Sequence, residues 1–141
     1  MSSTDTISLP KNYTAYIFGA ATVASWKQEV KIKVQSTDGD DENECTFQGV
    51  KNPLVITGGG LGFMNQEAVV VPADDNNDRQ IELDFKVFKN GATTASKIKG
   101  YQKDTHSPVS WVTNYTYNTE DGGDNDYHDT TLVVSMIKDT K

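Results

Sequence analysis

The sequence predicts an all-β protein, an antiparallel β-sandwich of about nine short strands. Apolar and polar residues alternate in segments 29–35 and 81–87, which is the period of a half-buried strand. Clusters of Gly, Pro, Asn and Asp interrupt the chain at short intervals, and no segment shows the 3.6-residue apolar period of an amphipathic helix. The 141 residues suffice for one core, so we expect a single domain spanning 1–141.

The first half of the chain is predicted to supply strands separated by polar turns. Segment 7–10 is an edge or lead-in strand, because Pro10 cannot donate to a ladder. In segment 29–35, Val30, Ile32 and Val34 alternate with polar residues and face the core. The remaining strands of this half are predicted at 12–21, 45–50 and 67–71, and segment 53–57 is apolar but is interrupted by the glycines that follow it.

The second half begins with the clearest strand pattern, at 81–87. Asn90-Gly91 follows it and predicts a tight hairpin, with 94–101 as the returning strand and Ile98 on its apolar side. Segment 104–108, which contains His106, is predicted to be a loop. Segment 109–117 is predicted to be a strand, and the apolar, β-branched segment 130–137 a buried one.

Between these last two strands lies the most unusual stretch of the chain, residues 119–130. It contains two glycines, no Lys or Arg, and five carboxylates: Glu120, Asp121, Asp124, Asp126 and Asp129. Such crowded negative charges favour a hard cation, since calcium takes six to eight oxygen ligands. A solvated turn is the alternative that composition leaves open. The spacing is not that of an EF-hand, and the second acidic run, 38–44, is predicted to be an exposed loop.

Charge and composition exclude several functions. The net charge of −7 argues against nucleic acid and against anionic membrane surfaces, and no apolar run is long enough for membrane insertion. Without an apolar leader, we expect a cytoplasmic protein or one exported without a cleaved signal peptide. Cys45 is the single cysteine and is interpreted as a small, half-buried strand residue and not as a reactive thiol. No nucleophilic triad is suggested, so an enzyme is not expected.

Three stretches resemble the small two-calcium lectins of Gram-negative bacteria that bind fucose and mannose. They are 7–12, which is similar to the opening strand of that family, 79–101, which is similar to its central hairpin, and 120–129, which is similar to its calcium loop. The resemblance implies a β-sandwich in which one or two Ca²⁺ ions bind fucose/mannose-type glycans through sugar hydroxyls. It also implies a homodimer or homotetramer.

The resemblance assigns roles residue by residue. It implies metal ligands at Glu120, Asp124, Asp126, Asp129, Thr22 and His128, and sugar contacts at Asp121, Gly123, Val23, Ala24 and Ser25. His128 and Thr22 stand where the family has Asn, and the chain continues through Lys138–Lys141 where family chains end in a Gly that reaches a partner's site. These differences favour an alternative hypothesis, a structural or assembly protein that keeps the fold and one or no calcium without binding sugar.

Overall fold

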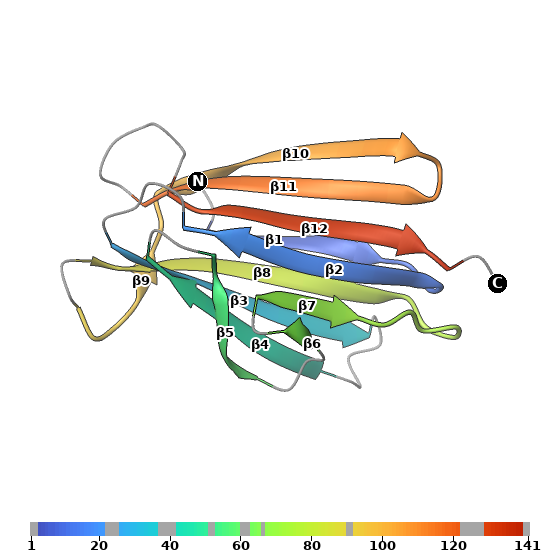
Figure 1. Ribbon diagram of the computed structural model, residues 1–141, viewed down its shortest axis with the longest axis horizontal. Coiled ribbons are helices and arrows are strands. Elements are labelled where there is room, and N and C mark those ends of the chain that lie inside the picture. Colours follow the sequence, from blue (N-terminus) through green and yellow to red (C-terminus); the bar gives the residue numbers. More distant parts are fainter. Residues whose placement is uncertain are drawn as a thin grey trace.

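The computed structural model describes residues 3–21, 26–36, 42–50, 53–59, 63–65, 67–89, 92–121 and 129–139. These residues form two antiparallel sheets that pack face to face (Figure 1), so the all-β sandwich is confirmed. Sheet I has the order β1-β8-β3-β4-β5, with β9 paired to β8, and sheet II has the order β10-β11-β12-β2-β7-β6. The strands are β1 (Thr4–Leu9), β2 (Tyr13–Ala20), β3 (Lys27–Ser36), β4 (Glu42–Gly49), β5 (Val55–Gly59), β6 (Phe63–Asn65), β7 (Ala68–Val71), β8 (Arg79–Phe88), β9 (Ser96–Lys97), β10 (Gly100–Val109), β11 (Val112–Glu120) and β12 (Thr131–Lys138).

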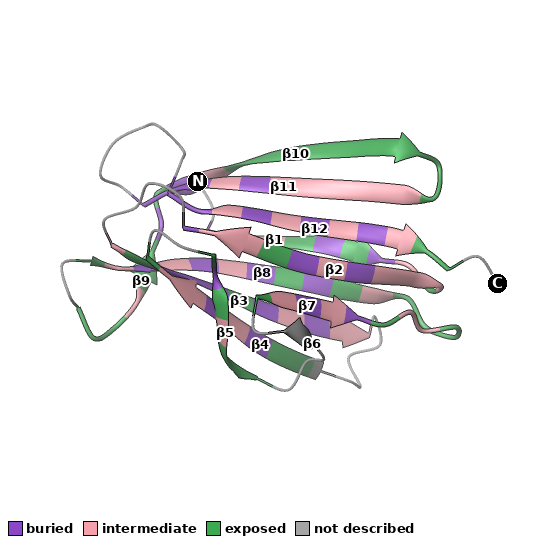
Figure 2. Cartoon of the chain, in the orientation of Figure 1, coloured by how far each residue is buried: buried purple, intermediate pink, exposed green. Residues whose placement is uncertain are grey.

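Alternation of side chains explains the core. In β3, Val30, Ile32 and Val34 are buried, and this strand pairs along its whole length with β8, whose apolar residues are buried in the same way. Figure 2 shows the resulting stripes, in which buried positions alternate with more exposed ones along strands such as β8 and β12. The described residues form twelve strands against the predicted nine or so, because several edge strands are only two to five residues long.

The predicted hairpin after β8 is wrong in its extent. Only Ser96 and Lys97 pair with β8, opposite Val87 and Lys86, which leaves far more than a two-residue turn between the strands. The chain then crosses to sheet II, where β10 pairs with β11. The Asn90-Gly91 pair itself lies outside the described residues. Ile98, between β9 and β10, is buried, as expected. It is apolar because it packs in the core at this crossover, and not because it belongs to a longer strand.

The loop predicted at 104–108 is also wrong, because these residues belong to β10. His106 pairs with Asn114 of β11 and is exposed. Strand β10 is at the edge of sheet II, and its residues from Gln102 onward are exposed. Ladder hydrogen bonds therefore hold a strand that lacks apolar alternation, the signal on which the sequence prediction depended. At the second acidic run, residues 42–44 similarly begin β4, and 37–41 lie outside the described residues.

Cys45 is buried in β4, more fully than the half-buried residue that the sequence predicted. Only 1% of its surface is exposed, and burial raises the pKa of its thiol to about 11. The thiol therefore stays protonated at neutral pH and behaves as a packed apolar group. Among the described residues, no helix is long and apolar enough to cross a membrane.

A polar cluster joins the two sheets beside the core. The buried Tyr117 of β11 donates its hydroxyl hydrogen to Oδ2 of Asp5 in β1 at 2.6 Å, and Nζ of Lys103 lies 2.7 Å from the same oxygen. Burial raises the pKa of Asp5, but hydrogen bonds from Lys103 and Tyr117 outweigh this and hold the pKa below its usual value. A carboxylate with a lowered pKa stabilises the fold above its unfolded pKa, and the contribution is lost as pH falls through the folded one.

Asp5→Asn should therefore reduce the acid sensitivity of the protein. The free energy of unfolding of the wild type should fall below about pH 4, and the variant should fall less over the same interval. The pair is partly exposed, so we expect a difference of about 1 kcal/mol or less. Urea denaturation at pH 7 and pH 3 measures it, with Asp104→Asn on exposed β10 as the control. Equal acid sensitivity in both variants would contradict the role of Asp5.

Candidate metal and ligand site

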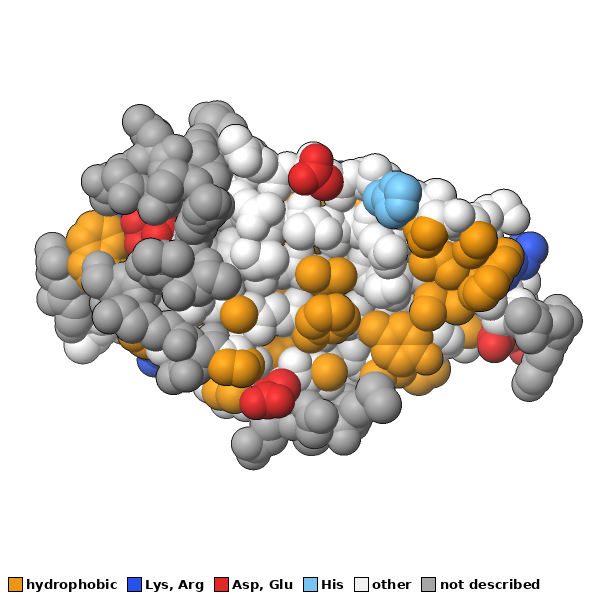
Figure 3. All heavy atoms as spheres, turned by 45° about the horizontal axis from the view of Figure 1, so that its top comes forward, with side chains coloured by type: hydrophobic (Ala, Val, Ile, Leu, Met, Phe, Trp, Pro, Cys, Tyr) orange, Lys and Arg blue, Asp and Glu red, His pale blue; other side chains and the backbone are white. Residues whose placement is uncertain are grey.

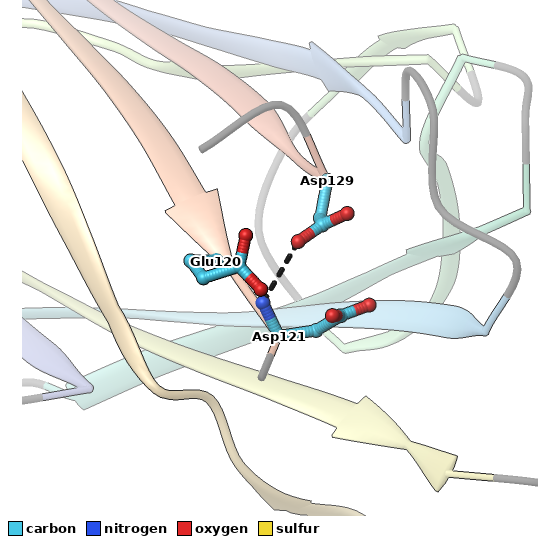
Figure 4. Close-up of side chains that lie close together, drawn as sticks. All are labelled: Glu120, Asp121 and Asp129. Atoms are coloured by element: carbon cyan, nitrogen blue, oxygen red, sulfur yellow. Dashed lines mark hydrogen bonds between the residues drawn. The ribbon is translucent and has the colours of Figure 1, made fainter. Parts of the chain in front are cut away.

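Three acidic residues meet where β11 ends and β12 begins. Glu120 is the last residue of β11, Asp121 follows it, and Asp129 precedes the start of β12. The two strands are antiparallel neighbours, with Asn118 opposite Thr131, so the sheet brings the ends of the intervening segment together. Figure 4 shows the three side chains close together. All three are buried, with exposed fractions of 0%, 5% and 6%.

Backbone hydrogen bonds fix the junction that carries these acids. The backbone N–H of Asp121 donates to Oδ2 of Asp129 at 2.8 Å, the contact drawn in Figure 4. The N–H of Asp129 donates to the carbonyl oxygen of Thr119 at 3.1 Å, and the N–H of Thr119 donates to the carbonyl oxygen of Thr130 at 2.9 Å. The carboxylates therefore stand on paired strand ends, which limits how far they can move apart.

A side chain from the opposite sheet completes the junction. Gln28 of β3 is 1% exposed, and its amide nitrogen donates to Oδ2 of Asp121 at 3.3 Å and to the carbonyl oxygen of Trp26 at 3.1 Å. Its amide oxygen accepts a hydrogen bond of 3.1 Å from the hydroxyl of Thr130. Gln28 thus ties the acidic end of sheet II to sheet I and orients the carboxylate of Asp121.

The chemistry of this cluster fits a hard cation. Glu120, Asp121 and Asp129 each offer an oxygen, and these oxygens lie within 4.8 Å of one another. Three like charges at this separation, buried from water, repel one another, and a cation bound among them would remove that cost. Carboxylate oxygens suit Ca²⁺ or Mg²⁺, whereas softer metals prefer sulfur and imidazole nitrogen. The cluster is therefore a group that could hold a metal ion.

The structure brings together three of the residues predicted from the sequence: the predicted ligands Glu120 and Asp129 and the predicted sugar contact Asp121. The other predicted site residues lie outside the described residues and stay predictions: Thr22, Val23, Ala24, Ser25, Gly123, Asp124, Asp126 and His128. The predicted residues Thr22 to Ser25 follow β2 in the sequence, and Gly123 to His128 precede β12. The described ends of these two strands are neighbours, since Ala20 of β2 pairs with Thr131 of β12.

Gln28 and Thr130 were not predicted as part of this site. Gln28 lies two residues before Val30 in β3, so it shares the inward face with Val30, Ile32 and Val34. The alternation in the sequence already indicated this. A buried amide needs polar partners, because an unpaired one costs about 1–3 kcal/mol. An inward glutamine at a strand end was therefore the available signal for a polar site nearby.

The fold and this site define a class of protein, a β-sandwich that gathers buried acids at one end of a sheet. Within that class, residues 7–138 match the family described as fucose-binding lectin II (PA-IIL). The chain belongs to this family of carbohydrate-binding lectins, which confirms the resemblance found in the sequence. No curated protein sequence matches the chain.

Two solved structures show the same fold. The high-affinity mannose-binding lectin of Ralstonia solanacearum has 20% sequence identity and a TM-score of 0.54, over 92% of this chain and 93% of that one. The C-terminal domain of the BC2L-C lectin from Burkholderia cenocepacia has 18% identity and a TM-score of 0.53, over 96% and 97%. At these low sequence identities, the likeness supports the β-sandwich fold alone. Ligand preference must be inferred from the residues of this chain.

Proposed function

We propose that this protein is a calcium-dependent lectin that binds fucose/mannose-type sugars at the β11–β12 junction. The observation that carries the proposal is the group of three buried carboxylates, Glu120, Asp121 and Asp129, inside the segment matched to the lectin family. Calcium bound there would supply coordination positions for vicinal sugar hydroxyls, which are hard oxygen ligands.

The roles of the residues follow from the family resemblance. Glu120 and Asp129 would hold the metal, together with the predicted ligands Thr22, Asp124, Asp126 and His128. Asp121 would accept a hydrogen bond from a sugar hydroxyl, and its fixed orientation by Gln28 suits a specific contact. The predicted sugar contacts Val23, Ala24, Ser25 and Gly123 would set which sugar is preferred.

Calorimetric titration with methyl fucoside and methyl mannoside, in calcium and in chelator, tests the proposal. We expect sugar binding in calcium and none after chelation. Calcium alone should raise the melting temperature, since an ion at 100 times its Kd stabilises the native state by about 2.7 kcal/mol. Sugar binding that persists in chelator would contradict the metal-based mechanism. Thermal stabilisation by calcium without any sugar response would favour the assembly-protein hypothesis.

Gln28→Leu should separate positioning from stability. The substitution removes the amide that donates to Asp121 and accepts from Thr130, and we expect about tenfold weaker sugar binding, the effect typical of a lost supporting contact. The matched control is Gln48→Leu, whose amide donates to Glu29 at 2.8 Å on the outer side of sheet I. The control should lose some stability but keep its sugar affinity. Equal sugar affinity in the two variants would show that Gln28 is merely structural.

A further inference from the structure

Exposed lysines gather at the same end of the sandwich as the buried acids. Four of the described lysines, all exposed, lie on the strand ends and connections at this end: Lys27, Lys89, Lys97 and Lys99. The backbone N–H of Lys99 donates to the carbonyl oxygen of Glu120 at 2.9 Å, which holds the connection from β9 to β10 beside the acidic cluster. By contrast, Figure 3 shows a face covered by hydrophobic and uncharged side chains, with Lys and Arg only at its margins.

Lys89 occupies an inward-facing position beside the cluster. The inward residues of β8 are the buried Ile81, Leu83, Phe85 and Val87. Lys89 directly follows β8 and continues this series two residues beyond Val87. Val87 pairs with Gln28 of β3, the residue whose amide donates to Asp121. The position of Lys89 is therefore at the edge of the space between the sheets, on the side of Asp121.

Trp26 holds the ammonium group of Lys89 beside this junction. Nζ of Lys89 lies 6.0 Å from the centroid of the Trp26 ring. The carbonyl oxygen of Trp26 accepts a hydrogen bond of 3.1 Å from the side-chain nitrogen of Gln28, and the same nitrogen donates to Oδ2 of Asp121 at 3.3 Å. One amide group thus joins Trp26 to the predicted sugar contact, so Lys89 and Trp26 border the proposed site.

The ammonium group of Lys89 is available to an anion. Among the described residues, no carboxylate pairs with it, and its contact with the Trp26 ring is at the outer limit of a cation–π interaction. Lysines elsewhere in the chain do pair, as Lys103 does with Asp5 at 2.7 Å. A charge-assisted hydrogen bond to an anionic oxygen is among the strongest that a protein forms. Lys89 can therefore bind an anion without breaking an ion pair.

We propose that Lys89, positioned by Trp26, forms a subsite that binds an anionic group of the glycan, such as a sulfate, a phosphate or a carboxylate. The proposal rests on the function proposed above, since the sugar at Asp121 would bring this group to Lys89. A cation held by Glu120 and Asp129 would offset their negative charges, which would otherwise repel the anion.

The overall charge of the chain makes such a subsite selective. The net charge of −7 repels polyanions in general, so an anionic ligand gains affinity only where a local cation and the metal act together. Exposed charges act over about 10 Å at ordinary ionic strength, so only an anion close to Lys89 would benefit. The ligand class is therefore a glycan with a charged group next to its metal-bound sugar.

Calorimetric titration of the full chain with the sulfated and desulfated forms of one fucose oligosaccharide tests the subsite. In calcium and at low ionic strength, we expect the sulfated form to bind about fivefold more tightly, the effect of one exposed ion pair. At an ionic strength of about 1 M the preference should disappear, because charges are then screened within about 3 Å.

Lys89→Gln should abolish this preference and keep the affinity for the desulfated form. Lys89→Arg retains the positive charge and should retain the preference. The matched control is Lys138→Gln, at an exposed lysine at the other end of β12, and it should bind both forms as the wild type does. Circular dichroism and thermal melting verify that each variant folds.

The outcomes separate this subsite from the proposed function. Equal affinity of the wild type for both forms in calcium would overturn the subsite and leave the lectin proposal standing. If neither form binds in calcium, both proposals fail. A preference that survives in Lys89→Gln would show that another group binds the anion, and binding of the sulfated form that chelator does not weaken would show that the anion binds apart from the metal site. Either result would overturn the subsite.

Discussion

Asp129→Asn should abolish calcium-dependent sugar binding and leave the fold intact. The substitution keeps an acceptor oxygen for the backbone N–H of Asp121 and keeps the size of the side chain, so the hydrogen bond of 2.8 Å can persist. It removes one of three negative charges whose oxygens lie within 4.8 Å of one another. Loss of the proposed ligand Asp129 should exceed the 10–100-fold cost of losing a supporting contact, so we expect metal affinity to fall by more than about 100-fold.

The sign of the effect on stability makes this test specific. In chelator, the variant should be as stable as the wild type or more stable, because a buried like charge has been removed. In calcium, the wild type should gain stability and the variant should gain much less. Asp75→Asn, at an exposed turn residue, is the control and should respond to calcium as the wild type does. Urea denaturation with and without calcium measures all three proteins. An equal gain in Asp129→Asn would show that the metal binds elsewhere.

The sequence was most informative where one face of a strand is buried. Val30, Ile32 and Val34 in β3 predicted an inward face that the structure confirms, because a two-residue period can place apolar side chains in the core in only one register. Strand β10 could not be predicted in this way. It is exposed and held by backbone pairing with β11, so His106 and its neighbours carry no periodic signal.

The acidic site was predictable in composition but not in its supporting contacts. The density of negative charge in the run that begins at Glu120 predicted a cation site. The structure brings Glu120, Asp121 and Asp129 of this run together at paired strand ends. The contact from Gln28 to Asp121 joins residues 93 positions apart. It depends on how two sheets stack, and no local pattern contains that information. A buried glutamine therefore predicts a polar partner without identifying it.

Phe85→Ala should cause the largest loss of stability among the substitutions considered. Phe85 in β8 is 1% exposed, and its ring centroid lies 5.7 Å from that of Tyr101 and 5.5 Å from that of Tyr117. Those two tyrosines belong to β10 and β11, so the ring of Phe85 packs sheet I against the part of sheet II that leads to Glu120. Removing a buried phenylalanine side chain costs about 3–5 kcal/mol.

The matched control is Phe88→Ala, three residues further along the same strand, where the ring is only half-buried and lies 4.9 Å from Nζ of Lys27. Its loss should be about 1 kcal/mol, since less apolar surface leaves water and the cation–π contact is exposed. Urea denaturation in chelator excludes a contribution from metal, and one protein concentration for all proteins keeps their stabilities comparable. Because β11 ends at the acidic cluster, Phe85→Ala should also weaken calcium binding, whereas Phe88→Ala should not. Similar losses of stability in the two variants would mean that the aromatic cluster does not join the sheets as the packing indicates.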